Sequence, residues 1–153
     1  MTRKIIVYLG ADHGGFTLKE KIKDFLDKKG IKWVDLGNVK FVASDDYPDF
    51  VLPVAQAVAK KHQARGIVIC RSGVGSCIAA NKVKGVRAVN AVSEKMAEMS
   101  RRHNNTNVLC LGADYISFTQ AKRIISKWIK TPFAGGRHAR RIRKISSFEN
   151  NNK

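Results

Sequence analysis

Short apolar segments rich in β-branched residues alternate along the chain with longer segments of helical periodicity. The apolar segments cover residues 5–10, 32–37, 66–70, 87–92 and 107–112. Strands of this length that alternate with helices are typical of βαβ units, which form a parallel sheet with right-handed crossovers. The pattern predicts an α/β fold, a Rossmann-like three-layer sandwich in which helices cover both faces of a five-stranded parallel sheet.

The segments between the predicted strands place apolar side chains at helical spacing among charged ones. In the first of them, Phe16, Ile22, Phe25 and Leu26 form one apolar stripe among Lys, Glu and Asp. Further helices are expected at about 48–62, 74–82, 93–103, 117–130 and 137–148. The chain has no repeat, low-complexity tract or linker, so we expect one domain at 1–148 and a polar tail at 149–153.

The charge of the chain is strongly positive and unevenly distributed. The net charge of +17 comes from 29 Lys and Arg against 12 Asp and Glu, and nearly all of the excess lies in residues 51–153. Such a field favours anionic partners, from sugar phosphates to nucleic acid. The basic residues are dispersed among apolar segments without an interleaved aromatic platform, which disfavours a dedicated nucleic-acid binder.

The apolar runs are too short for a membrane span, and the run at 5–9 is too short for the core of a signal peptide. We therefore expect a cytoplasmic protein. The cysteines are Cys70, Cys77 and Cys110, an odd number without C-x-x-C spacing, which argues against a disulfide framework and a zinc site. The four histidines also lack the close pairing of common metal motifs. We expect no metal.

The candidate site follows from the ends of the predicted strands, because ligands of open α/β sheets bind beyond the carboxyl ends of the strands. Asp12 and His13 follow the first strand, Cys70 and Ser72 end the third, and Asp114 follows the fifth. Glycines in the same loops allow backbone N–H groups to approach a ligand closely.

Cys70 ends a strand directly before a Gly73-Val74-Gly75 turn and a predicted helix. The free N–H groups at a helix start stabilise negative charge, which suits a thiol that acts as base or nucleophile. The alternative is a buried core cysteine, as we expect for Cys77 and Cys110. The turn itself is either an anion-binding nest or a plain tight turn. It does not continue into G-x-G-x-x-G, which argues against a dinucleotide cofactor.

Three arginines follow the Gly135-Gly136 break at the start of the last predicted helix, at positions 137, 140 and 141. Positive charge is unfavourable at a helix N-terminus, so an anionic ligand there would explain it. A solvated basic face is the competing explanation.

Six motifs occur in an order that resembles the type-B ribose-5-phosphate isomerases, a group that includes the galactose-6-phosphate isomerase subunits. They are Ala11-Asp12-His13-Gly14-Gly15, Asp46-Tyr47-Pro48-Asp49, Ile69-Cys70-Arg71-Ser72-Gly73-Val74-Gly75, Ala79-Ala80-Asn81-Lys82, Arg102-His103-Asn104-Asn105-Thr106-Asn107 and Gly135-Gly136-Arg137-His138. The resemblance covers residues 4–148 and is more specific for the group than for the sugar.

The resemblance implies an aldose–ketose isomerase of a phosphorylated sugar that works through an enediolate, without metal or organic cofactor. It also implies dimers, or tetramers built from them, with sites shared between subunits. The implied roles are as follows: Cys70 is the base at C2, His103 and Ser72 assist ring opening, Asp12 handles hydroxyl protons, Gly73, Gly75 and Asn104 stabilise the oxyanion, His13, Arg137 and Arg141 hold the phosphate, and Tyr47 packs against the sugar.

Three functions remain open from the sequence. The first is interconversion of ribose 5-phosphate and ribulose 5-phosphate in the pentose phosphate pathway. The second is the same chemistry on a 6-phosphohexose such as allose or galactose 6-phosphate. The third is an isomerase-like protein that binds sugar phosphate or nucleic acid without turnover.

Two residues depart from the pattern of the group. Arg71 stands where glycine is usual, and Asp114 stands where an arginine commonly helps to bind phosphate. Both follow neighbouring strands, so we predict that they form an ion pair in which Arg71 replaces part of the lost positive charge. A drifted substrate preference or a degraded phosphate site is the simpler explanation.

Overall fold

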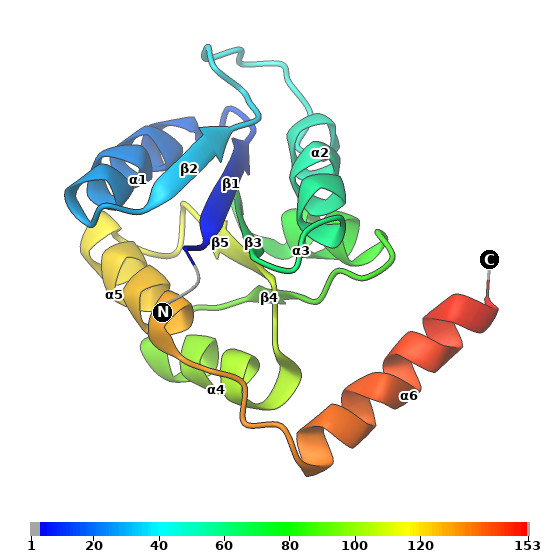
Figure 1. Ribbon diagram of the computed structural model, residues 1–153. Coiled ribbons are helices and arrows are strands. Elements are labelled where there is room, and N and C mark those ends of the chain that lie inside the picture. The colour runs from blue at the N-terminus through cyan, green and yellow to red at the C-terminus, as the bar shows by residue number, and fades with distance from the viewer. Residues whose placement is uncertain (1–3, 153) are drawn as a thin grey trace.

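The computed structural model describes residues 4–152, and its sheet has the predicted all-parallel architecture (Figure 1). The order of strands across the sheet is β2-β1-β3-β5-β4. The elements are β1 (Ile6–Ala11), α1 (Phe16–Lys28), β2 (Lys32–Asp35), α2 (Pro48–Ala59), β3 (Ala64–Cys70), α3 (Val74–Asn81), β4 (Ala88–Asn90), α4 (Glu94–Asn104), β5 (Val108–Gly112), α5 (Phe118–Lys130) and α6 (Arg137–Asn151). The predicted fold class is confirmed.

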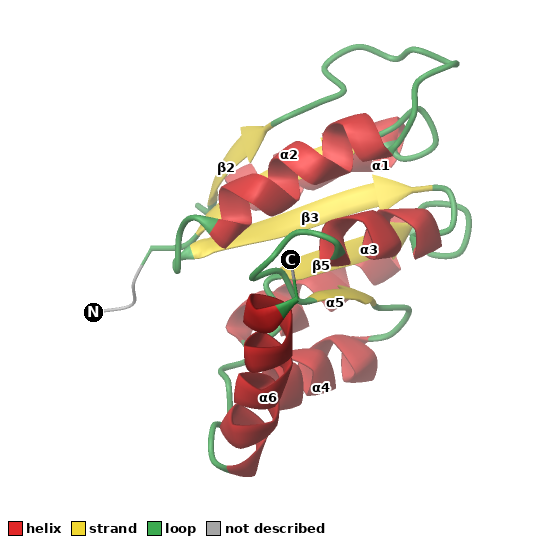
Figure 2. Ribbon diagram, turned by 90° about the vertical axis from the view of Figure 1, so that its right-hand side faces the viewer, coloured by secondary structure: helices red, strands yellow, loops and turns green. Residues whose placement is uncertain are grey.

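Helices cover both faces of the sheet. The helices α1, α4 and α5 lie on one face, and α2 and α3 lie on the other (Figure 2). The central strands β1, β3 and β5 are therefore buried on both sides, which explains why they are continuous apolar runs instead of alternating patterns.

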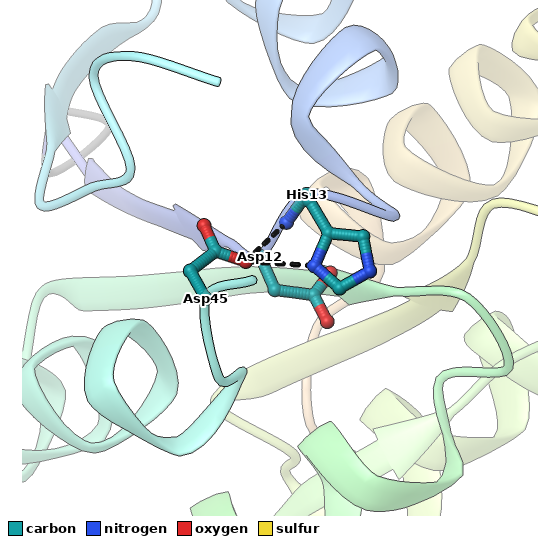
Figure 3. A group of neighbouring side chains, drawn as sticks. All are labelled: Asp12, His13 and Asp45. Atoms are coloured by element: carbon teal, nitrogen blue, oxygen red, sulfur yellow. Dashed lines mark hydrogen bonds and ion pairs between the residues drawn. The ribbon is translucent and has the colours of Figure 1, made fainter. Parts of the chain in front are cut away.

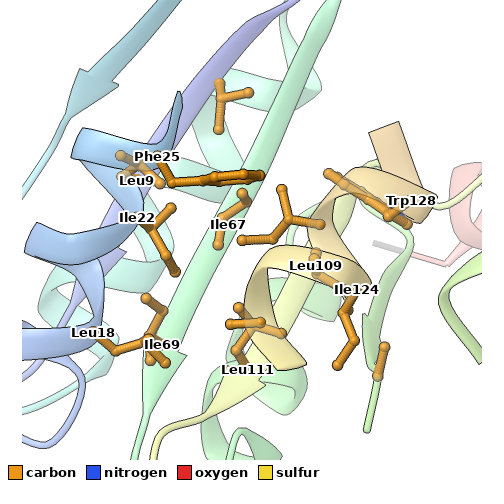
Figure 4. Packing of buried hydrophobic residues seen from close by; sticks show 14 of the residues in the cluster. Leu9, Leu18, Ile22, Phe25, Ile67, Ile69, Leu109, Leu111, Ile124 and Trp128 are labelled. Atoms are coloured by element: carbon orange, nitrogen blue, oxygen red, sulfur yellow. The ribbon is translucent and has the colours of Figure 1, made fainter. Parts of the chain in front are cut away.

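The larger core cluster lies between the sheet and the α1–α5 layer (Figure 4). Ile22 and Phe25 of α1 and Trp128 of α5 pack against β3 and β5, and each such side chain contributes about 1.5–3 kcal/mol by leaving water. The buried indole N–H of Trp128 donates to Thr106 Oγ1 at 2.9 Å. This packing fixes the strands whose carboxyl ends carry the candidate site.

The two edge strands are shorter than predicted. The strand β2 ends at Asp35 instead of residue 37, where Asp35 Oδ1 accepts the Gly37 N–H at 2.9 Å, although Leu36 and Gly37 still bond to the backbone of β1. The N–H of Arg87 donates to the side chain of Asn107 at 2.7 Å, and β4 begins one residue later. Short strands at the edges leave little unpaired backbone for other chains.

The last helix differs from the prediction in its end and in its packing. It continues to Asn151 instead of ending near residue 148, so residues 149–151 of the predicted polar tail are helical, and Lys153 lies outside the described residues. None of its residues is buried, and it projects from the body of the molecule (Figure 1). Its far end is held by Glu149 Oε2, which accepts the Gly85 N–H at 3.0 Å.

Within residues 4–152, no helix combines the length and apolar character needed to cross a bilayer.

Candidate active site

The thiol of Cys70 lies beneath the start of α3. Cys70 is the last residue of β3 and is buried, and its Sγ accepts the Gly73 N–H at 3.1 Å. Gly73 has a φ of 78°, in the left-handed region that glycine adopts without strain, and it caps α3. Ser72 Oγ accepts the Val74 N–H at 3.1 Å. The arrangement presents the N–H of the residue that caps α3 to the thiol, and Cys70 therefore lies at a helix start, as predicted from the turn.

Tyr47 borders the same loop from the start of α2. A Cβ atom at Gly75 would stand 2.6 Å from Tyr47 Cζ, so only glycine leaves room for this ring. The loop after β5 also lies close by, since the Ala113 N–H donates to the Cys70 carbonyl at 2.9 Å, and Asn90 at the end of β4 donates through Nδ2 to the Ser72 carbonyl at 3.3 Å. The carboxyl edge of the sheet thus gathers the residues that the sequence assigned to it.

The loop after β1 adds a carboxylate and a histidine to this edge (Figure 3). Asp12 is buried, and its Oδ1 accepts the N–H groups of Gly14 and Gly15 at 3.0 and 3.2 Å. His13 is held by Asp45, whose Oδ1 accepts the His13 backbone N–H at 2.7 Å and contacts its Nδ1 at 2.8 Å. This network fixes Asp12 and His13 at the carboxyl ends of the strands.

Asp45 was missed by the sequence-based prediction. It is one of three acidic residues in the five positions 45–49, and nothing in their spacing distinguishes it. The hydrogen bond that Asp45 accepts from the His13 ring, supported by the charge of Asp12, raises the pKa of His13. Burial alone would raise the pKa of Asp45, but hydrogen bonds from Asn38 and His13 lower it instead. The pair therefore favours the imidazolium–carboxylate form.

Asp12, His13 and Asp45 are also a group whose potential metal-ligand atoms lie within 4.8 Å of one another, in the part of the chain that the structure describes. The atoms already have other partners, because His13 Nδ1 contacts Asp45 and Asp12 Oδ1 accepts two backbone N–H groups. The arrangement is that of a hydrogen-bonded network. The expectation that the protein uses no metal stays a prediction.

Four of the predicted site residues lie at the opposite end of the strands, away from Cys70. The helix α4 begins after the carboxyl end of β4 and runs back, so His103 and Asn104 at its end lie near the amino ends of the strands (Figure 1). The His103 ring stacks on His138 of α6, with centroids 4.2 Å apart. Arg137 and Arg141 belong to the same helix. One chain therefore does not bring these four residues to Cys70.

Desolvation and the basic surroundings of His138 lower its pKa. Partial desolvation, His103 and the nearby arginines at 137, 141 and 102 lower the pKa of His138. An uncharged His138 can lie flat on His103 without charge repulsion. Arg137 and Arg141 form no ion pair with an acidic side chain within residues 4–152, so their positive charge at this end of the strands is uncompensated.

The predicted ion pair between Arg71 and Asp114 is present. Arg71 Nε lies 3.0 Å from Asp114 Oδ2, and the Arg71 carbonyl accepts the Asp114 N–H at 3.0 Å. The stem of Arg71 also covers Gly14, since a side chain at position 14 would overlap it. Arg71 thus connects the loops after β1, β3 and β5.

Taken together, these observations define a parallel α/β protein with a buried thiol at the carboxyl end of a central strand, beneath the start of a helix. The chain matches the family model described as Ribose/Galactose Isomerase over residues 7–145, and it belongs to that family.

Similar proteins, two of them with solved structures, align with nearly the whole chain. The structure of ribose-5-phosphate isomerase B from Mycoplasma genitalium with bound ribulose-5-phosphate has a TM-score of 0.94 and 46% identity, and covers 97% of this chain and 98% of that one. The Clostridium thermocellum ribose-5-phosphate isomerase B also has a TM-score of 0.94 and 46% identity, over 97% of this chain and 100% of that one. Ribose-5-phosphate isomerase B of Escherichia coli is 40% identical over 143 residues, 94% of this chain and 95% of the relative.

Proposed function

We propose that this protein interconverts ribose 5-phosphate and ribulose 5-phosphate by proton transfer through an enediolate. The observation that carries the proposal is the thiol of Cys70, which accepts the Gly73 N–H directly beneath the N-terminus of α3. The names of the similar proteins and the ribulose-5-phosphate bound in one of them support the same substrate.

The chemistry needs a positioned base and fixed donors, because the proton at C2 of the open sugar is only weakly acidic. Cys70 takes this proton and returns it to C1, which shifts the carbonyl from C1 to C2. Backbone N–H groups of the Gly73–Gly75 turn stabilise the oxyanion that develops meanwhile. Asp12 lies next to the thiol loop and moves the hydroxyl proton between O1 and O2. Ser72 assists opening of the sugar ring.

A complete site requires two chains in this proposal. Four residues lie at the other end of the strands from Cys70 and would complete the site around Cys70 in a second copy. They are His103, Asn104, Arg137 and Arg141. The exposed helix surfaces support such a pairing, because Val74 and Ile78 of α3 and Ile145 and Phe148 of α6 expose more than half of their surface. The second copy supplies ring opening through His103 and a phosphate clamp through the two arginines.

A cytoplasmic location completes the proposal. The three cysteines are free thiols, a state that a reducing compartment preserves.

Mixing two inactive variants tests the shared site. Cys70→Ala and His103→Ala are purified separately, then unfolded and refolded together, and formation of ribulose 5-phosphate is measured. Random pairing makes half of the dimers mixed, with one chain of each variant. In each mixed dimer, one of the two sites combines an intact Cys70 with an intact His103. We expect recovery of about one quarter of the wild-type activity. Two variants of the same edge, Cys70→Ala and Ser72→Ala, are the matched control and should not complement. Absence of recovery in the first mixture would contradict a shared site.

A further inference from the structure

Asp45 holds His13 through two contacts to one oxygen. Its Oδ1 accepts the His13 backbone N–H at 2.7 Å and lies 2.8 Å from the ring Nδ1, while its Oδ2 accepts Asn38 Nδ2 at 2.9 Å. The carboxylate is nearly buried, with 7% of its side-chain surface exposed, whereas the ring of His13 is 29% exposed (Figure 3). Both oxygens of the acid thus have hydrogen-bond partners, and the side of the His13 ring that carries Nε2 faces away from Asp45.

The contact determines which atom of the ring carries a proton. An ionised carboxylate only accepts hydrogen bonds, so Nδ1 must be the protonated nitrogen. Nε2 is then the atom left for a ligand. In the neutral ring Nε2 presents a lone pair, which repels a phosphate oxygen. In the cation it presents an N–H, which forms a charge-assisted hydrogen bond with that oxygen.

The charged groups around the ring favour the cation. Asp45 and Asp12 raise the pKa of His13 above its ordinary value of 6.5, against a smaller opposing effect of desolvation. Arg71 comes from the loop after β3 and covers Gly14, but Asp114 holds its guanidinium. The positive form of His13 therefore exists below the raised pKa and disappears as pH rises through it.

We propose that Asp45 is a positioning residue that fixes the His13 ring with Nε2 free and makes it a pH-gated cation for the substrate phosphate. This inference rests on the proposed function and on the phosphate-holding role that the resemblance implies for His13. Above the gate, the fixed tautomer turns an attractive contact into a repulsive one, so binding should weaken more than loss of one charge alone would cause. An unrestrained neutral histidine could instead rotate or change tautomer and still donate.

Sulfate is the probe that isolates this effect, because its charge is constant from pH 5 to 9. Its affinity is measured by calorimetry across that range for wild type, Asp45→Asn, and Asp49→Asn, which removes an exposed carboxylate from the first turn of α2. We expect wild-type affinity to fall as pH rises through the His13 pKa. In Asp45→Asn the fall should begin at lower pH, with up to about tenfold weaker binding for each pH unit of displacement. Asp49→Asn should follow wild type.

NMR titration of the His13 ring in the same variants measures the gate directly. Asparagine keeps the hydrogen-bond acceptor, and Asp45→Ser, which also removes the charge, should give the same displacement if the asparagine variant does not fold. The phosphate of ribose 5-phosphate itself titrates near a pKa of about 6, so variant and wild type are compared at each pH. The ratio of their KM values should follow the ratio of their sulfate affinities while kcat stays unchanged. An unmoved sulfate limb or ring titration in both variants would overturn the proposal, as would a fall in kcat at constant KM. Sulfate and ring titrations need no turnover, so failure of the isomerase assignment is distinguishable from failure of this inference.

Discussion

Arg71 and Asp114 lie side by side at the mouth of the site, with Nε and Oδ2 3.0 Å apart. Both residues are exposed, so solvent screens their attraction and the pair adds little to stability. Its importance is its position, because Arg71 directly follows Cys70 and Asp114 follows β5. In the proposed function, the pair neutralises an acid that would otherwise repel the substrate phosphate.

Reversing the pair tests whether Arg71 offsets Asp114. Arg71→Gly should raise KM for ribose 5-phosphate by leaving Asp114 uncompensated, and Asp114→Arg should crowd two cations together. The double variant should retain kcat/KM about fivefold better than the product of the single losses predicts. Steady-state kinetics of all four proteins provide the cycle. Losses that simply multiply would show that the two residues act independently.

Cys77 should be the most readily alkylated thiol that the isomerase mechanism does not use. The facing Cys110 thiol lowers the pKa of Cys77 to about 7 against the opposing effect of burial, and Asn90 and Asn81 assist. Asn81 Nδ2 lies 3.6 Å from its sulfur. Burial raises the pKa of Cys110, which should stay unmodified.

Iodoacetamide labelling followed by peptide mass spectrometry measures this reactivity. The rate at Cys77 should rise through a midpoint near pH 7, and Cys77→Ser should lose that label while retaining isomerase activity. A midpoint near the ordinary thiol value of about 8.5 would contradict the prediction.

A completely buried lysine stabilises the loop that carries Asp45. Lys19 Nζ lies 2.5 Å from Asp35 Oδ2 and 3.1 Å from Glu20 Oε1, and Asp35 Oδ1 holds the turn after β2. Lys19→Met leaves part of a buried charge unpaired and should lower the free energy of unfolding by roughly 3 kcal/mol. Lys28→Met, an exposed change on the same helix, should cost less than about 0.5 kcal/mol. Urea unfolding at pH 7 measures both.

The contact between Lys19 and Asp35 should also make the free energy of unfolding fall at acidic pH. Burial alone would raise the pKa of Asp35, but the lysines and the Gly37 N–H lower it. Its contribution is therefore complete above the unfolded value and is lost as pH falls through the lower folded value. Unfolding measured from pH 6 down to pH 2 should show a smaller loss in Lys19→Met than in wild type. Equal slopes would indicate that Lys19 does not set the Asp35 pKa.

Local patterns predicted the fold well because each element carries its own signal. The central strands are apolar runs and the helices have stripes, so their positions agree within a few residues. The Arg71–Asp114 pair was predictable for a similar reason, because Cys70 and Gly112 are partners in adjacent parallel strands. The ends of β2 and β4 were not, because they depend on local contacts. Leu36, Gly37 and Asn38 still bond to β1 beyond the end of β2, and the Asn107 side chain accepts the Arg87 N–H.

The composition of the site was only partly predictable. Strand ends indicated Asp12, His13, Cys70 and Ser72, but Asp45 lies in a long loop whose path depends on tertiary contacts. The separation of His103 from Cys70 follows from the direction of α4 relative to the sheet. A linear sequence contains both residues without indicating that they lie at opposite ends of the strands in one chain.

The most direct test of the account is proton exchange followed by NMR with ribose 5-phosphate in D₂O, for wild type, Cys70→Ala and Cys77→Ala. Wild type and Cys77→Ala should form ribulose 5-phosphate and exchange the transferred hydrogen with solvent, whereas Cys70→Ala should be slower by at least about a hundredfold. Undiminished turnover by Cys70→Ala would contradict the assignment of the base. A wild-type protein that is silent with ribose 5-phosphate but converts a 6-phosphohexose would contradict the pentose assignment.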